Sequence, residues 1–115
     1  MADYIDALRR QHIENVLKAM IFEALQRNDL KFTRPYALLS LMSLGERSDP
    51  DEIFEQAEQE GYEGTEEGIK AGLKALRASG LVLKDRGEFK LNPWFESELS
   101  DFATDLRKAI GFAKA

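Results

Sequence analysis

The segment from residue 65 to residue 94 constrains the fold most strongly, because helix-ending and turn-forming residues follow one another there at short intervals. Thr65 is a suitable N-cap for a helix over residues 66–79, and Gly80 can end that helix in the left-handed conformation. Two short apolar runs, 81–83 and 88–91, are strand candidates. Gly87, between them, can supply the positive φ of a tight turn. A helix followed directly by a two-stranded β-hairpin is therefore predicted.

The first segment, roughly residues 3–27, contains no proline or glycine and is rich in strong helix formers, which predicts a long helix. Its apolar residues fall on two sides of the helical wheel. One side carries Ile5, Leu8, His12 and Val16, and the other carries Ile13, Leu17, Met20, Ala24 and Leu25. The two sides predict two different neighbours for this helix, and they put the single histidine, His12, in a buried or half-buried structural position.

Three further helices are indicated by an N-cap residue next to a proline in the first turn. These pairs are Thr33 with Pro35, Ser48 or Asp49 with Pro50, and Asn92 with Pro93. The helix that ends near Gly45 is the most apolar and is expected at the centre of the core. With 115 residues, the chain is expected to form one domain, 1–115. It comprises an N-terminal helix within 1–30, a core within 31–91 and a C-terminal helix within 92–115.

The composition excludes several classes of site. The chain has no cysteine and one histidine, so no thiolate chemistry is possible, and no local spacing indicates a metal site. No glycine-rich phosphate loop accompanies the many carboxylates, so neither an enzyme nor a bound cofactor is expected. No apolar run approaches the roughly 20 residues that cross a bilayer, and the first residues do not resemble a signal peptide, so a cytoplasmic protein with no membrane partner is expected.

The net charge of −5 is distributed unevenly along the chain. Residues 46–65 carry eight acidic side chains and one basic side chain, whereas residues 66–91 carry six basic and four acidic side chains. The acidity is thus concentrated in the segment just before the 66–79 helix.

The order of three helices, a two-stranded hairpin and a last helix resembles the winged helix-turn-helix superfamily. The join Leu76-Arg77-Ala78-Ser79-Gly80-Leu81-Val82 is similar to the L-x-x-x-G-L-V sequence that links the recognition helix and the wing in many bacterial regulators. The resemblance covers about residues 34–91. It implies a mainly α fold of the α+β class, a winged helix-turn-helix with a two-stranded β-hairpin wing and long N- and C-terminal helices. It also implies that helix 66–79 enters a major groove of double-stranded DNA and that the wing, 84–90, lies beside it.

Six cations fit the DNA-binding role that the resemblance implies. Lys70, Lys74 and Arg77 share one face of the 66–79 helix, and Lys84, Arg86 and Lys90 lie in the wing. A transcriptional regulator that binds duplex DNA is the first functional hypothesis. The eight acids of residues 46–63 oppose it, because the helix before a recognition helix crosses the DNA backbone. The alternative is a winged-helix protein-interaction module that docks through the acidic helix 51–60 or through the small-residue face of helix 66–79.

The C-terminal helix carries an apolar seam with spacings of four, three, four and four. Its residues are Phe95, Leu99, Phe102, Leu106 and Ile110. The seam either covers its own domain or pairs with another helix, the first helix or a second copy of the chain. A homodimer through this seam is favoured, because a twofold dimer would suit a palindromic DNA site.

Overall fold

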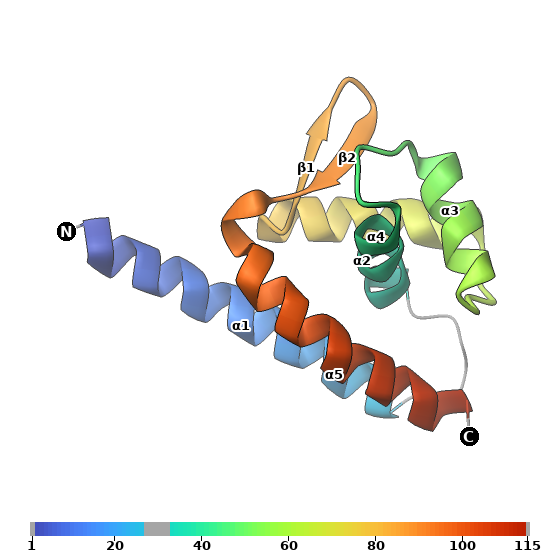
Figure 1. Cartoon of the computed structure of the whole chain (residues 1–115), viewed down its shortest axis with the longest axis horizontal. Coiled ribbons are helices and arrows are strands. Elements are labelled where there is room, and N and C mark those ends of the chain that lie inside the picture. Colours follow the sequence, from blue (N-terminus) through green and yellow to red (C-terminus); the bar gives the residue numbers. More distant parts are fainter. Residues whose placement is uncertain (1, 27–32, 115) are drawn as a thin grey trace.

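The computed structural model describes residues 2–26 and 33–114 and is mainly helical, with one small β-sheet (Figure 1). The elements are α1 (Ala2–Gln26), α2 (Thr33–Leu44), α3 (Pro50–Gln59), α4 (Glu66–Ser79), β1 (Val82–Asp85), β2 (Glu88–Leu91), the short 3₁₀ helix η1 (Pro93–Phe95) and α5 (Glu96–Lys114). The prediction of long terminal helices flanking shorter helices and a two-stranded hairpin is confirmed. The part of the predicted N-terminal helix over residues 27–30 lies outside the described residues.

Local sequence signals set the boundaries of α3 and α4 as predicted. Thr33, predicted as an N-cap, is instead the first residue of α2, and Asn92 caps the 3₁₀ helix η1 that precedes α5. The backbone N–H of Gly68 donates to Thr65 Oγ1 at 3.1 Å and closes the N-terminus of α4. Gly80 ends α4 with a φ of 90°, a conformation that costs glycine little. At the start of α3, Asp49 and Glu52 form a reciprocal capping box. These two carboxylates therefore serve the helix end.

Helix α2 forms the centre of the core, as its apolar sequence predicts. It contacts both α3 and α4, and its residues from 35 to 41 are all buried. The approach of α4 is close, because a Cβ on Gly72 would lie only 2.9 Å from the carbonyl carbon and oxygen of Thr33. Part of the small-residue face of α4 is thus occupied by the chain's own α2.

Helices α1 and α5 lie side by side, run in the same direction and form a second layer against the core (Figure 1). On α1 the buried residues are Ile13, Leu17 and Met20, which are at most 5% exposed. Arg10 forms an ion pair with Glu98 and joins the two helices. Of the predicted side with Ile13, Leu17 and Met20, these three residues are therefore buried, whereas Leu25 is 54% exposed. On the other predicted side, Val16 is partly buried, whereas Ile5 and Leu8 are exposed.

The hairpin is antiparallel, with Val82 opposite Leu91 and Asp85 opposite Glu88. Arg86 and Gly87 have φ values of 53° and 82°, which are the two positive angles of a type I′ turn. On the other side of β2, Ser48 and Phe89 exchange two backbone hydrogen bonds of 2.8 and 3.0 Å. This bridge, which the sequence did not predict, fastens the α2–α3 connection to the hairpin.

Among the described residues, none of the helices combines the length and the apolar character needed to cross a membrane.

Candidate nucleic-acid interface

Helix α4 presents its cations on a face that is turned away from the core. Ile69, Leu73 and Leu76 are fully buried, whereas Lys70, Lys74 and Arg77 are exposed. This division follows from the helical period, because the three cations are offset from the apolar stripe by roughly 100°. The structure therefore brings the three predicted cations of α4 onto one open face.

A groove of about 360 Å³ lies between this face and the hairpin. Its lining residues are Pro50, Lys70, Leu73, Lys74, Arg77, Lys84, Gly87 and Phe89. Apolar side chains form part of the lining, and four cations surround them. We call this feature the basic groove. The basic groove brings three cations of α4 together with one cation of the hairpin. A helix and a strand have different periods, so spacing along the sequence does not relate these residues.

Lys84 reaches the basic groove because of the strand register. It pairs with Phe89 across the hairpin, and residues directly opposite each other in a sheet project from the same face. The Lys84 ammonium lies 5.4 Å from the centre of the Phe89 ring, a distance at which a cation is attracted to an aromatic face. Phe89 thus helps to orient this lysine.

The other two predicted cations of the wing are placed differently. Arg86 is exposed at the tip of the hairpin, beside Gly87, which lines the basic groove. Lys90 is half-buried and lines a separate hollow with Arg47. Because successive strand residues alternate between faces, Lys90 projects away from the side that carries Phe89. Five of the six predicted cations therefore lie in or beside the basic groove, and Lys90 does not.

Carboxylates gather at one end of the basic groove. Pro50 lines the groove, and Asp51 follows it in the chain. A hydrogen bond with the Asp51 carboxyl raises the pKa of Glu66, with smaller contributions from burial and from the Asp51 charge. Glu67 lies 3.7 Å from the Lys70 ammonium and partly neutralises it. Asp51, Glu66 and Glu67 therefore lie near the groove, although none of these three is among its lining residues.

A further ion pair, which the sequence did not predict, lies at the turn end of the hairpin. Arg47 Nη1 lies 2.9 Å from Asp85 Oδ2, and both side chains are about half exposed. This contact holds a cation and an acid of the hairpin region together, in addition to the Ser48–Phe89 bridge. The only sequence signal for it was the isolated Arg47 within the acidic segment.

The seam of α5 lies inside the chain. Phe95, Leu99, Phe102, Leu106 and Ile110 are all at most 5% exposed and belong to the single hydrophobic core. They are covered by the fold itself, chiefly by α1, which is the helix that contacts α5 most closely. A dimer through these residues would require α5 to separate from α1.

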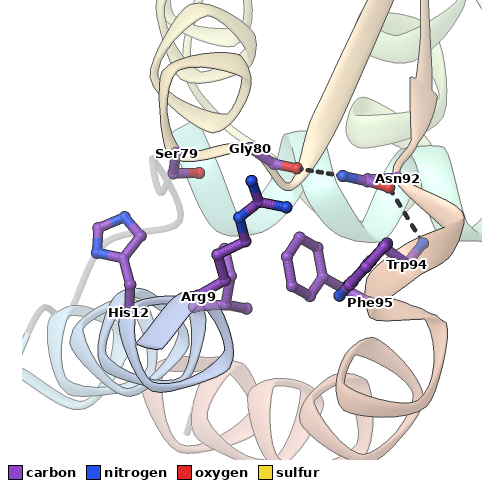
Figure 2. Close-up of a pocket in the computed structure, with 8 residues that line it drawn as sticks. Arg9, His12, Ser79, Gly80, Asn92, Trp94 and Phe95 are labelled. Atoms are coloured by element: carbon purple, nitrogen blue, oxygen red, sulfur yellow. Dashed lines mark hydrogen bonds between the residues drawn. The ribbon is translucent and has the colours of Figure 1, made fainter. Parts of the chain in front are cut away.

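A second hollow, of about 300 Å³, lies between α1 and the end of α4 (Figure 2). Figure 2 shows Arg9 reaching into it between His12 and Phe95, with Trp94 at one side. Asn92 closes the hollow: its side chain donates to the Gly80 carbonyl at 2.9 Å and accepts from the Trp94 N–H at 3.1 Å.

His12 is exposed, so the prediction of a buried structural histidine is wrong. Its ring lines the second hollow rather than the core, and Ile5 and Leu8 on the same side of α1 are exposed as well. In the described parts of the chain, no three histidine or carboxylate side chains cluster closely enough to hold a metal ion.

No protein-family model matches the chain, and no curated protein or solved structure is significantly similar to it.

Proposed function

We propose that the chain is a winged helix-turn-helix regulator of transcription that binds double-stranded DNA through α4 and the hairpin. The observation that carries this proposal is the basic groove, in which cations from two separate segments converge. Lys70, Lys74, Arg77 and Lys84 line it, and Arg86 extends it at the hairpin tip. Four or five cations on one surface suit the phosphates that flank a groove of DNA.

The arrangement of the elements supports the same proposal. The Ser48–Phe89 bridge ties the α2–α3 connection to β2, while α4 passes directly into β1 through Gly80. Helices α3 and α4 and the hairpin therefore form one unit, as expected of a helix-turn-helix with a wing. With 14 residues, α4 is about 21 Å long, and the major groove, about 12 Å wide, admits a helix.

The test is a titration of fluorescent random-sequence duplex DNA, followed by anisotropy at several salt concentrations. Each neutralised phosphate contributes about −0.9 to the slope of log K against log salt. With four or five cations in contact, the expected slope is about −4. Absence of binding at low salt would overturn the proposal and leave the acidic surface as the dominant feature.

Charge reversals locate the binding surface. The double variant Lys74→Glu with Arg86→Glu should abolish binding, because both side chains are exposed at or beside the basic groove. The matched control is Lys90→Glu with Lys108→Glu, which changes the net charge equally. Lys90 lines a different hollow, and Lys108 lies on α5. Equal losses in both variants would mean that net charge alone governs binding and that the groove is not the site.

One observation supports the alternative, a protein-docking module. The exposed side of α3 carries Glu55 and Glu58, and neither carboxylate has an ion-pair partner among the described residues. A basic peptide or protein surface would fit this side. Under this alternative, Glu55→Lys with Glu58→Lys would abolish capture of the partner, whereas Lys74→Glu with Arg86→Glu would leave it unchanged.

A further inference from the structure

The outward side of α1 carries a regular seam that nothing in the chain covers. Seven positions alternate in spacing between four and three residues, and all seven are exposed. They are Tyr4, Leu8, Gln11, Asn15, Lys18, Phe22 and Leu25. We call them the outer seam. Its mean spacing of about 3.5 residues is that of a helix that packs along its length against a second helix.

The two ends of the outer seam are apolar and its centre is polar. Tyr4 and Phe22 are 68% and 61% exposed, and Leu8 and Leu25 are 53% and 54% exposed. Since a fully buried aromatic side chain covers about 150–250 Å², these four residues leave roughly 400 Å² of apolar surface open on one helix. It is divided into two patches, Tyr4 with Leu8 and Phe22 with Leu25, one at each end of the helix. A helix that covers it must be apolar at both ends and polar between them.

Helix α1 itself can cover much of this surface, because six of the seven positions of the outer seam are related by symmetry about residue 13, and only Leu25 has no counterpart among them. Tyr4, Leu8 and Gln11 lie as far before this residue as Phe22, Lys18 and Asn15 lie after it. When two copies of α1 run antiparallel, Tyr4 is therefore level with the partner's Phe22, and Gln11 is level with the partner's Asn15. The side chains of Gln11 and Asn15 already share a hydrogen bond of 3.2 Å within one chain, which shows that both amides lie along this seam.

Charge selects the antiparallel arrangement over the parallel one. In a parallel pair, Lys18 would face the partner's Lys18 across the seam, and two ammonium groups would repel each other. In the antiparallel pair, Lys18 is level with the partner's Leu8, over which its aliphatic stem can lie while the ammonium stays in water. Antiparallel helix dipoles also attract one another.

We propose that the chain forms a homodimer through the outer seam, with α1 packed antiparallel against α1 of a second copy. The four apolar side chains leave roughly 400 Å² open on each copy, so the two copies together supply roughly 800 Å². With the polar centre and the flanking residues, the interface reaches the roughly 1,000 Å² that a specific contact needs. The proposal does not rest on DNA binding, because none of its residues lies in the basic groove.

The first measurement is the mass of the full chain in solution, by sedimentation velocity at increasing concentration. As the protein concentration is raised to about 100 µM, a dimer should become populated, because an interface of this size is expected to associate in that range. The variant Leu8→Lys should shift the chain to monomer, because the new lysine would be level with the partner's Lys18. A wild-type chain that stays monomeric throughout would overturn the proposal.

A charge swap tests the antiparallel register itself. Adding Lys18→Glu to Leu8→Lys should restore the dimer, because each new lysine is then level with a glutamate of the other copy. Residues 8 and 18 are about 15 Å apart along one helix, so the rescue cannot arise within a single chain. A parallel pair would gain no such contact, and loss of the dimer without rescue would overturn the register.

The matched control is Leu83→Lys, which adds a lysine in place of an exposed leucine on the hairpin. Leu83 is 39% exposed and lies outside the outer seam. This variant should keep the wild-type mass at every concentration. Circular dichroism of all variants checks that each remains helical. A dimer that survives Leu8→Lys, or that is lost equally with Leu83→Lys, would show that a different surface holds the two copies together.

Discussion

Gly72→Ala tests the close approach of α2 and α4, on which the position of the basic groove depends. A Cβ at residue 72 would lie 2.9 Å from the carbonyl carbon and oxygen of Thr33 and 3.1 Å from the nitrogen of Arg34. Carbon atoms in ordinary contact are about 3.5–4.0 Å apart. All three neighbouring atoms belong to the backbone, so a rotamer change cannot relieve the contact, and the two helices must separate.

The magnitude follows from two opposing contributions. Inserting a methyl group into a well-packed site costs about 1–3 kcal/mol. Replacing glycine by alanine inside a helix contributes about 1 kcal/mol in the other direction. The expected net change is a loss of about 0–2 kcal/mol in the free energy of unfolding. For 115 residues, each kcal/mol corresponds to roughly 4 °C in Tm, so Tm should fall by up to about 8 °C.

The control is Gly111→Ala, in the other glycine-containing helix, α5. An added Cβ there meets nothing within 4 Å, so only the helix propensity changes, and Tm should stay the same or rise by a few degrees, about 4 °C at most. Thermal and urea unfolding, followed by circular dichroism at one fixed protein concentration, measure both variants. If Gly72→Ala stabilised the chain as much as Gly111→Ala, α2 would not lie against α4 as described, and the reasoning would fail.

Two further predictions concern the groove and the α4–α5 connection. Glu66→Gln should strengthen DNA binding at neutral pH. The raised pKa means that wild-type Glu66 takes up a proton as the pH falls, so wild-type affinity should rise toward acidic pH and the variant should show a weaker pH dependence in anisotropy titrations. Asn92→Ala removes two hydrogen bonds, to the Gly80 carbonyl and from the Trp94 N–H, and should lower the free energy of unfolding by about 1–2 kcal/mol in urea. Unchanged urea midpoints would show that water replaces both bonds without cost.

The sequence predicted the elements whose boundaries depend on local chemistry. Thr65 and Gly80 delimit α4 through a side-chain hydrogen bond and a positive φ, which are properties of a few neighbouring residues. The Ser48–Phe89 bridge could not be predicted in this way. A single paired serine leaves no alternating pattern, and its partner lies about forty residues away along the chain.

The site was predictable in part for a related reason. Lys70, Lys74 and Arg77 follow the helical period, so their common face could be derived from spacing alone. Lys84 and Lys90 lie on different faces of the hairpin. This difference follows from the register, in which Lys84 pairs with Phe89 and Lys90 pairs with Leu83. The sequence predicted a hairpin, but the faces of its residues were not assigned from the register, and all cations of the wing were treated alike.

Apolar periodicity indicates that a helix face is covered, but it does not identify what covers it. The α5 seam and the outer seam of α1 both have the spacing of a packed helix, yet α5 is buried by its own chain and the outer seam is exposed. The distinction depends on which helix the fold brings to each face. Because α5 covers the side of α1 that carries Ile13, Leu17 and Met20, the outer seam on the opposite side stays exposed.

The net charge of −5 is a weak argument against DNA binding, because charges act over short distances in salt. The Debye length is about 8 Å at physiological ionic strength, so a phosphate senses mainly the charges beside it. Asp49 and Glu52 of the acidic segment are engaged in a capping box. Beside the basic groove, the carboxylates of Asp51, Glu66 and Glu67 stand against four or five cations. At the groove, the excess of cations favours binding of a polyanion. The exposed side of α3 is acidic and favours binding of a cationic partner, so one chain can present both surfaces.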